Sequence, residues 1–169
     1  NRDGVVQRLR DNVDDLYIMS KPPVDIDAAI HAFLPNPLVL IAPVGHALAG
    51  RTHVMLADLH AERFVLREKG SGTRLTTDAH FAKHHFVPRL RLEMGSNEAL
   101  KQAVAGGLGL SVVSQHALGP DLAGQGLTVL GVEGFPVESN WYTVHLRGKR
   151  LSPLATAFMQ YLDHFAAKA

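Results

Sequence analysis

The pentapeptide Gly70-Ser71-Gly72-Thr73-Arg74 has the residue types of an anion-binding loop. It follows an apolar run, Phe64-Val65-Leu66-Arg67, and opens a segment with helical periodicity, so we expect a strand, a turn and a helix N-terminus in that order. Unpaired backbone N–H groups, the positive end of the helix dipole, two small hydroxyls and one guanidinium together favour an anion there. The alternative is an ordinary strand-to-helix turn in which Thr73 caps the helix and Arg74 points into solvent.

A second helix start has the same character. The alternating segment 89–94 is typical of a strand, and Ser96 and Asn97 follow it as the cap and first residue of a helix. Two such N-termini after neighbouring strands would open into one crevice, which favours a site for an anion or a polar small molecule. Ser20 stands at the equivalent strand end in the other half of the chain, beside Lys21, although both also suit a solvated turn.

Other motifs that could carry chemistry do not hold up. The loop at 70–74 lacks the spacing of a P-loop. The glycines around Gly109 lack the spacing of a nucleophile elbow, and the role expected for these glycines is helix-to-strand packing. His80 and His84 lie four residues apart on one predicted helix, but without the His-Glu-x-x-His pattern a solvated helix face is favoured over a metal site. No carboxylate pair stands out as an acid/base couple. We therefore expect no cofactor, no metal and no enzymatic activity.

Composition limits the class of protein. The 169 residues, 46% hydrophobic and 20% charged, suffice for one large domain or two small lobes with a core. The net charge of +1 argues against nucleic-acid binding through this segment, and the absence of cysteine excludes disulfides and thiolate chemistry. The longest apolar run, Pro37 to Val44, is far too short to span a membrane. The first residues, Asn1-Arg2-Asp3, lack an initiator Met and suggest a fragment of a longer protein.

Predicted strands and helices alternate along the chain, which is typical of an α/β fold with mostly parallel sheets. Apolar or alternating runs predict strands at 16–19, 29–34, 38–42, 64–67, 89–94, 108–114, 127–132 and 141–146. One predicted helix has the apolar face Leu75, Ala79, Ala82 and Phe86, and the closing helix has the stripe Leu154, Phe158, Tyr161, Leu162 and Phe165. Proline-bounded joints near residues 43 and 134–140 suggest two hinge crossings. We expect a first lobe of residues 1–42 and 141–169, a second lobe of residues 43–140, and a ligand in the cleft between them.

The order of these motifs resembles the effector-binding domain of LysR-type transcriptional regulators, and most closely the subgroup that controls Calvin-cycle (RuBisCO) operons. The resemblance covers essentially the whole chain and is specific as an ordered set. The matching stretches are residues 12–19, 37–43, 46–50, 70–74, 96–104, 106–111, 141–145 and 149–153.

The resemblance implies a periplasmic-binding-protein-like fold of two lobes that holds a small anionic metabolite and is not an enzyme. The implied effectors are a phosphorylated sugar or acid, or NADPH. Promoter DNA would be bound by an N-terminal winged helix-turn-helix that is absent from this chain, in a cytoplasmic homodimer or tetramer that has no membrane contact. The alternative is a periplasmic-type solute-binding protein of a transporter, which shares the fold.

The same resemblance maps effector contacts onto Asn1, onto the loop Gly70, Ser71, Gly72, Thr73 and Arg74, and onto Ser96 and Asn97. Ser20 stands where the subgroup usually has glycine. The first strand–helix–strand of the family's domain is missing here, and the missing strand would lie beside residues 16–19. We therefore expect an incomplete first lobe whose exposed apolar edge pairs with another copy or drives aggregation.

Overall fold

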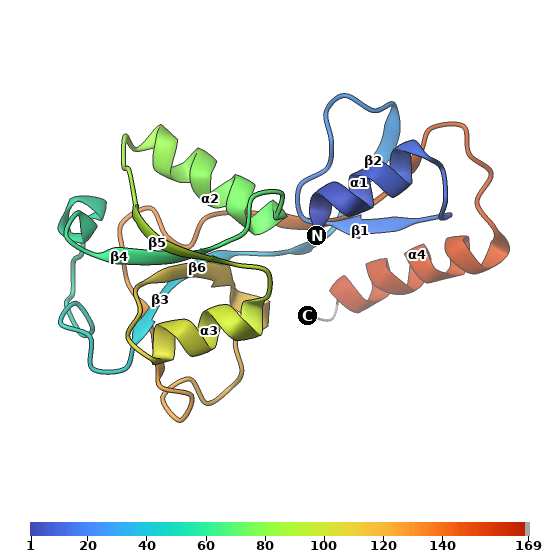
Figure 1. Ribbon diagram of the computed structural model, residues 1–169. Helices are drawn as coiled ribbons and strands as arrows, with labels where there is room; N and C mark the ends of the chain where they lie inside the picture. Colours follow the sequence, from blue (N-terminus) through green and yellow to red (C-terminus); the bar gives the residue numbers. More distant parts are fainter. Residues whose placement is uncertain (168–169) are drawn as a thin grey trace. The chain divides into compact units, whose positions relative to one another are not determined.

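The computed structural model describes residues 1–167 and separates into two compact units (Figure 1). The first unit combines Asn1–Asn36 with the segment from Ser139 onward, and the second unit is the continuous stretch Pro37–Glu138. The predicted boundaries lay at residues 42 and 140, so the strand that follows Pro37 lies in the second unit here and not in the first.

The first unit is a three-stranded sheet with two helices. Its elements are α1 (Arg2–Arg10), β1 (Tyr17–Met19), β2 (Ala28–Pro35), β8 (Asn140–Leu146) and α4 (Pro153–Ala166). The strand order is β1-β8-β2, and β8 runs antiparallel to both neighbours. Val6 and Leu9 of α1 pack on Tyr17, Met19 and Val144 to form the core of this unit.

The second unit contains two sheets and two helices. Its elements are β3 (Leu38–Pro43), β4 (Arg63–Arg67), α2 (Gly72–Lys83), β5 (Arg89–Met94), α3 (Asn97–Ala105), β6 (Ser111–Ser114) and β7 (Leu127–Leu130), with short 3-10 turns at Leu56–Leu59 and Gln115–Ala117. One sheet has the order β6-β3-β7 with antiparallel pairs, and the other is the parallel pair β4-β5.

The central strand β3 explains why this unit has two apolar layers. Leu38, Leu40 and Ala42 pack into a core with Phe64 and Phe81, whereas Val39 and Ile41 pack on the opposite face against α3. The alternation follows from the two-residue period of a strand, so an uninterrupted apolar run is buried on both faces.

The predicted α/β class agrees with the structure, but the expectation of mostly parallel sheets is wrong. Among the named strands of the described chain, only β4 and β5 pair in parallel, and every other pair is antiparallel. A continuous apolar run suggested a parallel strand because parallel sheets are usually covered on both faces. Here β3 achieves the same coverage while running against β6 and β7.

Two predicted helix faces also differ from the structure. The buried residues of α2 are Gly72, Arg74, Thr77 and Phe81, and the predicted face fails because Leu75 is exposed. In α4 only Ala155 and Leu162 are buried, while most of the predicted apolar stripe is exposed: Leu154, Phe158, Tyr161 and Phe165. In the described part of the chain, no helix is long and apolar enough to cross a membrane.

Candidate anion-binding site

The loop after β4 forms the predicted turn and helix start. Gly70 has a φ of +87°, a left-handed conformation that glycine adopts without strain, and α2 begins at Gly72. Ser71 is the N-cap, because its Oγ accepts a hydrogen bond from the backbone N–H of Arg74. The cap is therefore Ser71 and not Thr73. Among residues 1–167, the N–H groups of Gly72 and Thr73 have no hydrogen-bond partner, which leaves two donors at the positive end of a 12-residue helix.

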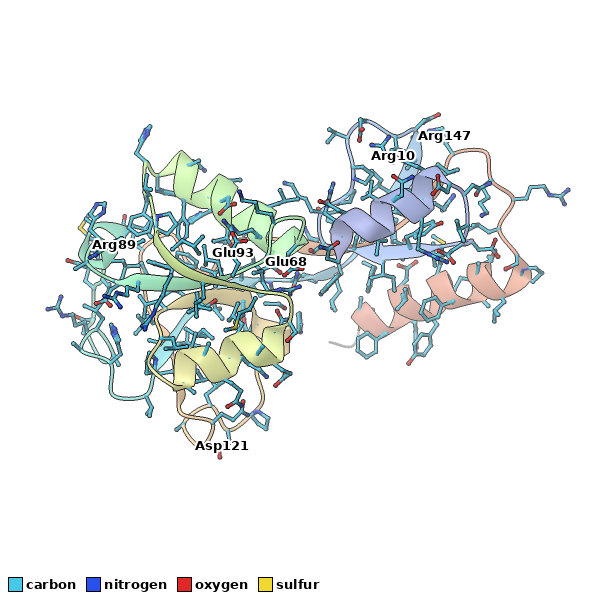
Figure 2. All side chains as sticks on the ribbon, viewed as in Figure 1. Arg10, Glu68, Arg89, Glu93, Asp121 and Arg147 are labelled. Carbon is cyan, nitrogen blue, oxygen red and sulfur yellow. The ribbon has the colours of Figure 1, made fainter. Side chains whose placement is uncertain are left out.

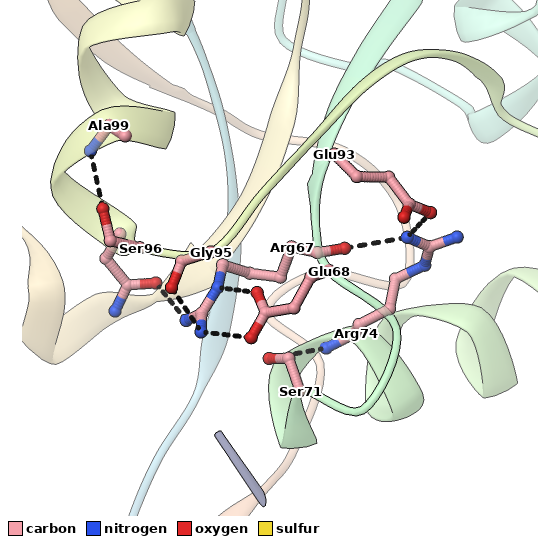
Figure 3. A network of polar contacts seen from close by, with 9 residues as sticks. Arg67, Glu68, Ser71, Arg74, Glu93, Gly95, Ser96 and Ala99 are labelled. Atoms are coloured by element: carbon pink, nitrogen blue, oxygen red, sulfur yellow. Dashed lines mark hydrogen bonds and ion pairs between the residues drawn. The ribbon is translucent and has the colours of Figure 1, made fainter. Parts of the chain in front are cut away.

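Arg74 points inward, not into solvent. Its Nε donates to both carboxylate oxygens of Asp78 at 2.9 Å, and its Nη1 donates to Glu93 Oε1 at 2.7 Å and to the carbonyl of Arg67 at 2.8 Å. Only 9% of its side chain is exposed. Burial lowers the pKa of the guanidinium, but the hydrogen bonds to Glu93 and Asp78 outweigh burial and leave that pKa above its usual value. Arg74 therefore joins α2 to β4 and β5 (Figure 3), and its partner Glu93 is also labelled in Figure 2. A contact between Arg74 and an anion stays a prediction.

The second helix start lies at the same sheet edge. Because β4 and β5 are parallel and Arg67 is in register with Met94, the helices that follow both strands begin side by side. Ser96 caps α3, with its Oγ 3.2 Å from the N–H of Ala99. The structure thus brings the predicted residues 70–74 together with Ser96 and Asn97.

Between the two helix starts lies a pair of charged residues that the sequence patterns did not single out. Arg67 ends β4, and its Nε and Nη2 donate to the two carboxylate oxygens of Glu68 at 2.9 and 3.2 Å. Its Nη1 donates to Asn97 Oδ1 at 2.8 Å, and Nη2 also lies 3.5 Å from the carbonyl of Gly95 (Figure 3). The signal in the sequence was a charged pair directly between an apolar run and the glycine loop.

Most cations near this edge are neutralised by carboxylates. Arg67 faces Glu68, Arg74 faces two carboxylates, and Lys101 lies 2.7 Å from Glu98. Lys69 is exposed and has no ion pair within the described residues. An incoming anion would therefore meet backbone N–H groups, the Thr73 hydroxyl, the Asn97 amide and the Lys69 ammonium.

The remaining predicted site residues belong to the first unit. Asn1 is the N-cap of α1, and its Oδ1 accepts a hydrogen bond from the N–H of Gly4 at 3.2 Å. Ser20 is half-buried and follows β1 directly. A role for either residue in ligand binding stays a prediction.

The paired histidines of α2 are not a uniformly solvated face. His84 is exposed, but His80 is half-buried, and its Nε2 is buried without a hydrogen-bond partner. Its ring centroid lies 4.9 Å from that of Phe135 and 4.6 Å from that of His84. Among the described residues, no group of three or more His, Asp or Glu side chains is placed to hold a metal ion.

Comparison with known sequences identifies the family. The profile of the LysR substrate binding domain matches residues 1–167. The chain belongs to this family. A RuBisCO operon transcriptional regulator from Acidithiobacillus ferrooxidans is 46% identical over 169 residues, which are 100% of this chain and 54% of the relative. A regulator of the same description from Allochromatium vinosum is 47% identical over 168 residues, which are 99% of this chain and 56% of the relative. The chain thus spans about half the length of these curated relatives.

Solved structures agree. The regulatory domain of CcmR from Synechocystis PCC6803, solved in complex with 2-PG, superposes with a TM-score of 0.93 at 46% identity, over 98% of this chain and 80% of that one. The effector-binding domain of QuiR in complex with shikimate gives a TM-score of 0.85 at 21% identity over 98% of this chain and 78% of that one, which supports the fold alone. The resemblance to LysR-type effector domains, and to the regulators of RuBisCO operons among them, is confirmed.

Proposed function

We propose that this LysR-type effector-binding domain senses a small phosphorylated acid and thereby regulates genes of carbon fixation. The observation that carries the proposal is the 46% identity to the CcmR regulatory domain, whose structure holds 2-PG, 2-phosphoglycolate. The relatives named as RuBisCO operon regulators support the class of target gene.

The chemistry of the candidate site suits such a ligand. A phosphate group brings oxygen acceptors and a charge near −2, and it favours hydrogen-bond donors at a helix N-terminus. The free N–H groups of Gly72 and Thr73, the hydroxyl of Thr73 and the ammonium of Lys69 are donors of this kind. Because α2 has no acidic residue in its first turn, no carboxylate there opposes the anion.

The regulatory role involves parts of the protein beyond this chain. Several relatives are named HTH-type transcriptional regulators or activators, which favours this role over the solute-binding alternative. We propose that the whole protein is a cytoplasmic homo-oligomer that binds promoter DNA through an N-terminal helix-turn-helix. The net charge of +1 fits a segment that senses a metabolite and leaves DNA contact to another domain.

Calorimetry tests the effector assignment. The domain is titrated with 2-phosphoglycolate, with a sugar bisphosphate and with NADPH, while glycolate and inorganic phosphate serve as fragments of the first ligand. We expect 2-phosphoglycolate to bind more tightly than either fragment, because the two anionic groups engage donors together. Binding of NADPH alone would contradict a phosphorylated acid as the effector.

A conservative substitution tests the location of the site. Thr73→Val removes the hydroxyl but keeps the shape of the side chain, and we expect the affinity for 2-phosphoglycolate to fall about tenfold, since a hydrogen bond to a charged group contributes about 1.5–3 kcal/mol. Thr76→Val, three residues further along α2, is the matched control and should bind as tightly as the unchanged domain. Equal affinities for both variants would place the ligand elsewhere.

A further inference from the structure

Arg67 contacts three other residues at the candidate site. It spans from the end of β4 to the start of α3, and it bonds Glu68, Asn97 and the carbonyl of Gly95 (Figure 3). Only 15% of its side chain is exposed, and its charge is balanced by the Glu68 carboxylate. The guanidinium therefore offers an anion little uncompensated charge.

The contact with Asn97 has a consequence for recognition. A side-chain amide has an acceptor end, Oδ1, and a donor end, Nδ2. Because Oδ1 accepts a hydrogen bond from Arg67 Nη1 at 2.8 Å, the Nδ2 donors are directed away from Arg67. The reversed amide would bring Nδ2 against a guanidinium that has only donors, which is unfavourable. Arg67 thus fixes which end of Asn97 is available to a ligand.

The orientation matters because an oxyanion accepts hydrogen bonds and repels other acceptors. With Nδ2 available, Asn97 presents donors at the start of α3, whereas a reversed amide would present a partially negative oxygen there. On the basis of the proposed function, we propose that Arg67 is a positioning residue for effector recognition, which acts by holding the Asn97 amide with its donors toward the anion.

A double-mutant cycle tests whether Arg67 acts through Asn97. Arg67→Met keeps the apolar stem but removes the cation that faces the Glu68 carboxylate, which changes the charge near the anion. All variants therefore carry Glu68→Gln, and Arg67→Met, Asn97→Ala and their combination are compared in that background. The readout is the dissociation constant for 2-phosphoglycolate by calorimetry, with thermal unfolding measured in parallel.

We expect each single substitution to weaken binding about tenfold, the size of one lost hydrogen bond to a charged ligand, and the combination to weaken it no further. A purely structural role for Arg67 would lower affinity equally with and without Asn97. Arg67→Lys in the same Glu68→Gln background serves as a second variant, because an ammonium can donate a hydrogen bond to Asn97 Oδ1 but cannot replace the planar fork of the guanidinium. Its affinity should lie between those of Arg67 and Arg67→Met.

The outcomes separate this inference from the proposed function. Additive losses, or an Arg67→Met affinity equal to that of the Glu68→Gln background, would overturn the positioning role while leaving the effector assignment intact. If the unsubstituted domain bound no phosphorylated acid, the effector assignment and the positioning role would both be wrong.

Discussion

The sequence patterns and the structure differ most at individual residues. Hydrophobic periodicity assumes that a charged residue faces water, and Arg74 violates that assumption because its guanidinium donates to acceptor groups of three residues, Asp78, Glu93 and Arg67. Two of those partners lie on strands, one of them 19 residues away. A local pattern cannot reveal partners at that separation, so the same residue looked like a free cation.

Arg74→Ala should therefore affect stability more than ligand binding. The substitution removes a buried guanidinium together with its hydrogen bonds to two exposed carboxylates, and we expect a loss of about 1–3 kcal/mol in the free energy of unfolding. Urea unfolding and calorimetry with 2-phosphoglycolate measure the two effects on one sample. A variant that unfolds like the parent but binds far more weakly would instead support a direct contact between Arg74 and the anion.

His80 gives the domain a specific sensitivity to acid. Burial lowers the pKa of its imidazole, and the charges of His84 and Lys83 lower it further. In the unfolded chain the pKa is near its ordinary value of about 6.5, so below that pH the unfolded state takes up a proton that the folded state resists. The contribution of neutral His80 to the free energy of unfolding is thus complete above pH ~6.5. It is lost as the pH falls from there toward the pKa that His80 has in the folded protein.

His80→Phe should flatten this part of the pH profile. The ring contact with Phe135 is retained, but the titrating nitrogen is gone, so less stability is lost between about pH 7 and pH 5. Urea unfolding across that range measures the slope, and His53→Gln, at a side chain that is 72% exposed, is the control. An unchanged slope in the His80 variant would show that other groups dominate the acid response.

At the scale of elements, the sequence predicted where strands and helices lie along the chain better than it predicted which strands pair with one another. The apolar run of β3 correctly indicated burial on both faces, but its antiparallel neighbours depend on residues far along the chain: Leu38 pairs with Ser114, and Leu40 with Leu130. The two helix starts were also predicted in the right places, because a polar cap after a strand is a local signal. Arg67 and Asn97 were not linked, since 30 residues separate them.

Of the glycines after α3, Gly109 has the packing role expected for them, and substitution can show it. A Cβ on Gly109 would lie 2.4 Å from the carbonyl oxygen of Arg63, whereas a Cβ on Gly107 would have no atom within 4 Å. Both glycines have positive φ, so Gly107→Ala measures backbone strain alone, about 1–2 kcal/mol. Gly109→Ala should cost at least about twice as much, because β4 must also move. Equal losses in thermal unfolding would contradict this close approach.

At the scale of the molecule, the first unit leaves apolar surface uncovered. Leu154, Phe158, Tyr161 and Phe165 are exposed along α4, with stacked rings 6.5 Å apart, and Ile18 is exposed on the edge strand β1. Contiguous exposed apolar patches usually mark an interaction surface or a liability to aggregate. This surface fits the expectation that the chain associates with another copy or aggregates, which stays a prediction.

Replacing two rings of this stripe should make the 169-residue chain more monomeric. Phe158→Lys combined with Tyr161→Lys adds charge to the exposed face without touching the buried residues Ala155 and Leu162. Sedimentation velocity over a range of concentrations should show weaker association than in the parent chain. Gln160→Lys is the matched control on the same helix. If the parent chain sedimented as a monomer at every concentration, this prediction would be wrong.

The first unit is built from two segments that are far apart in the sequence, and this affects the order in which the two units can fold during synthesis. Residues 37–138 form one uninterrupted stretch, whose ends meet where Leu38 and Val137 exchange hydrogen bonds. A ribosome that has released this stretch has supplied every strand of the second unit. The first unit, begun earlier, still lacks β8, the strand between β1 and β2. Residues 1–36 are therefore synthesised before residues 37–138 but complete their fold after them, because β1 and β2 stay unpaired until β8 emerges.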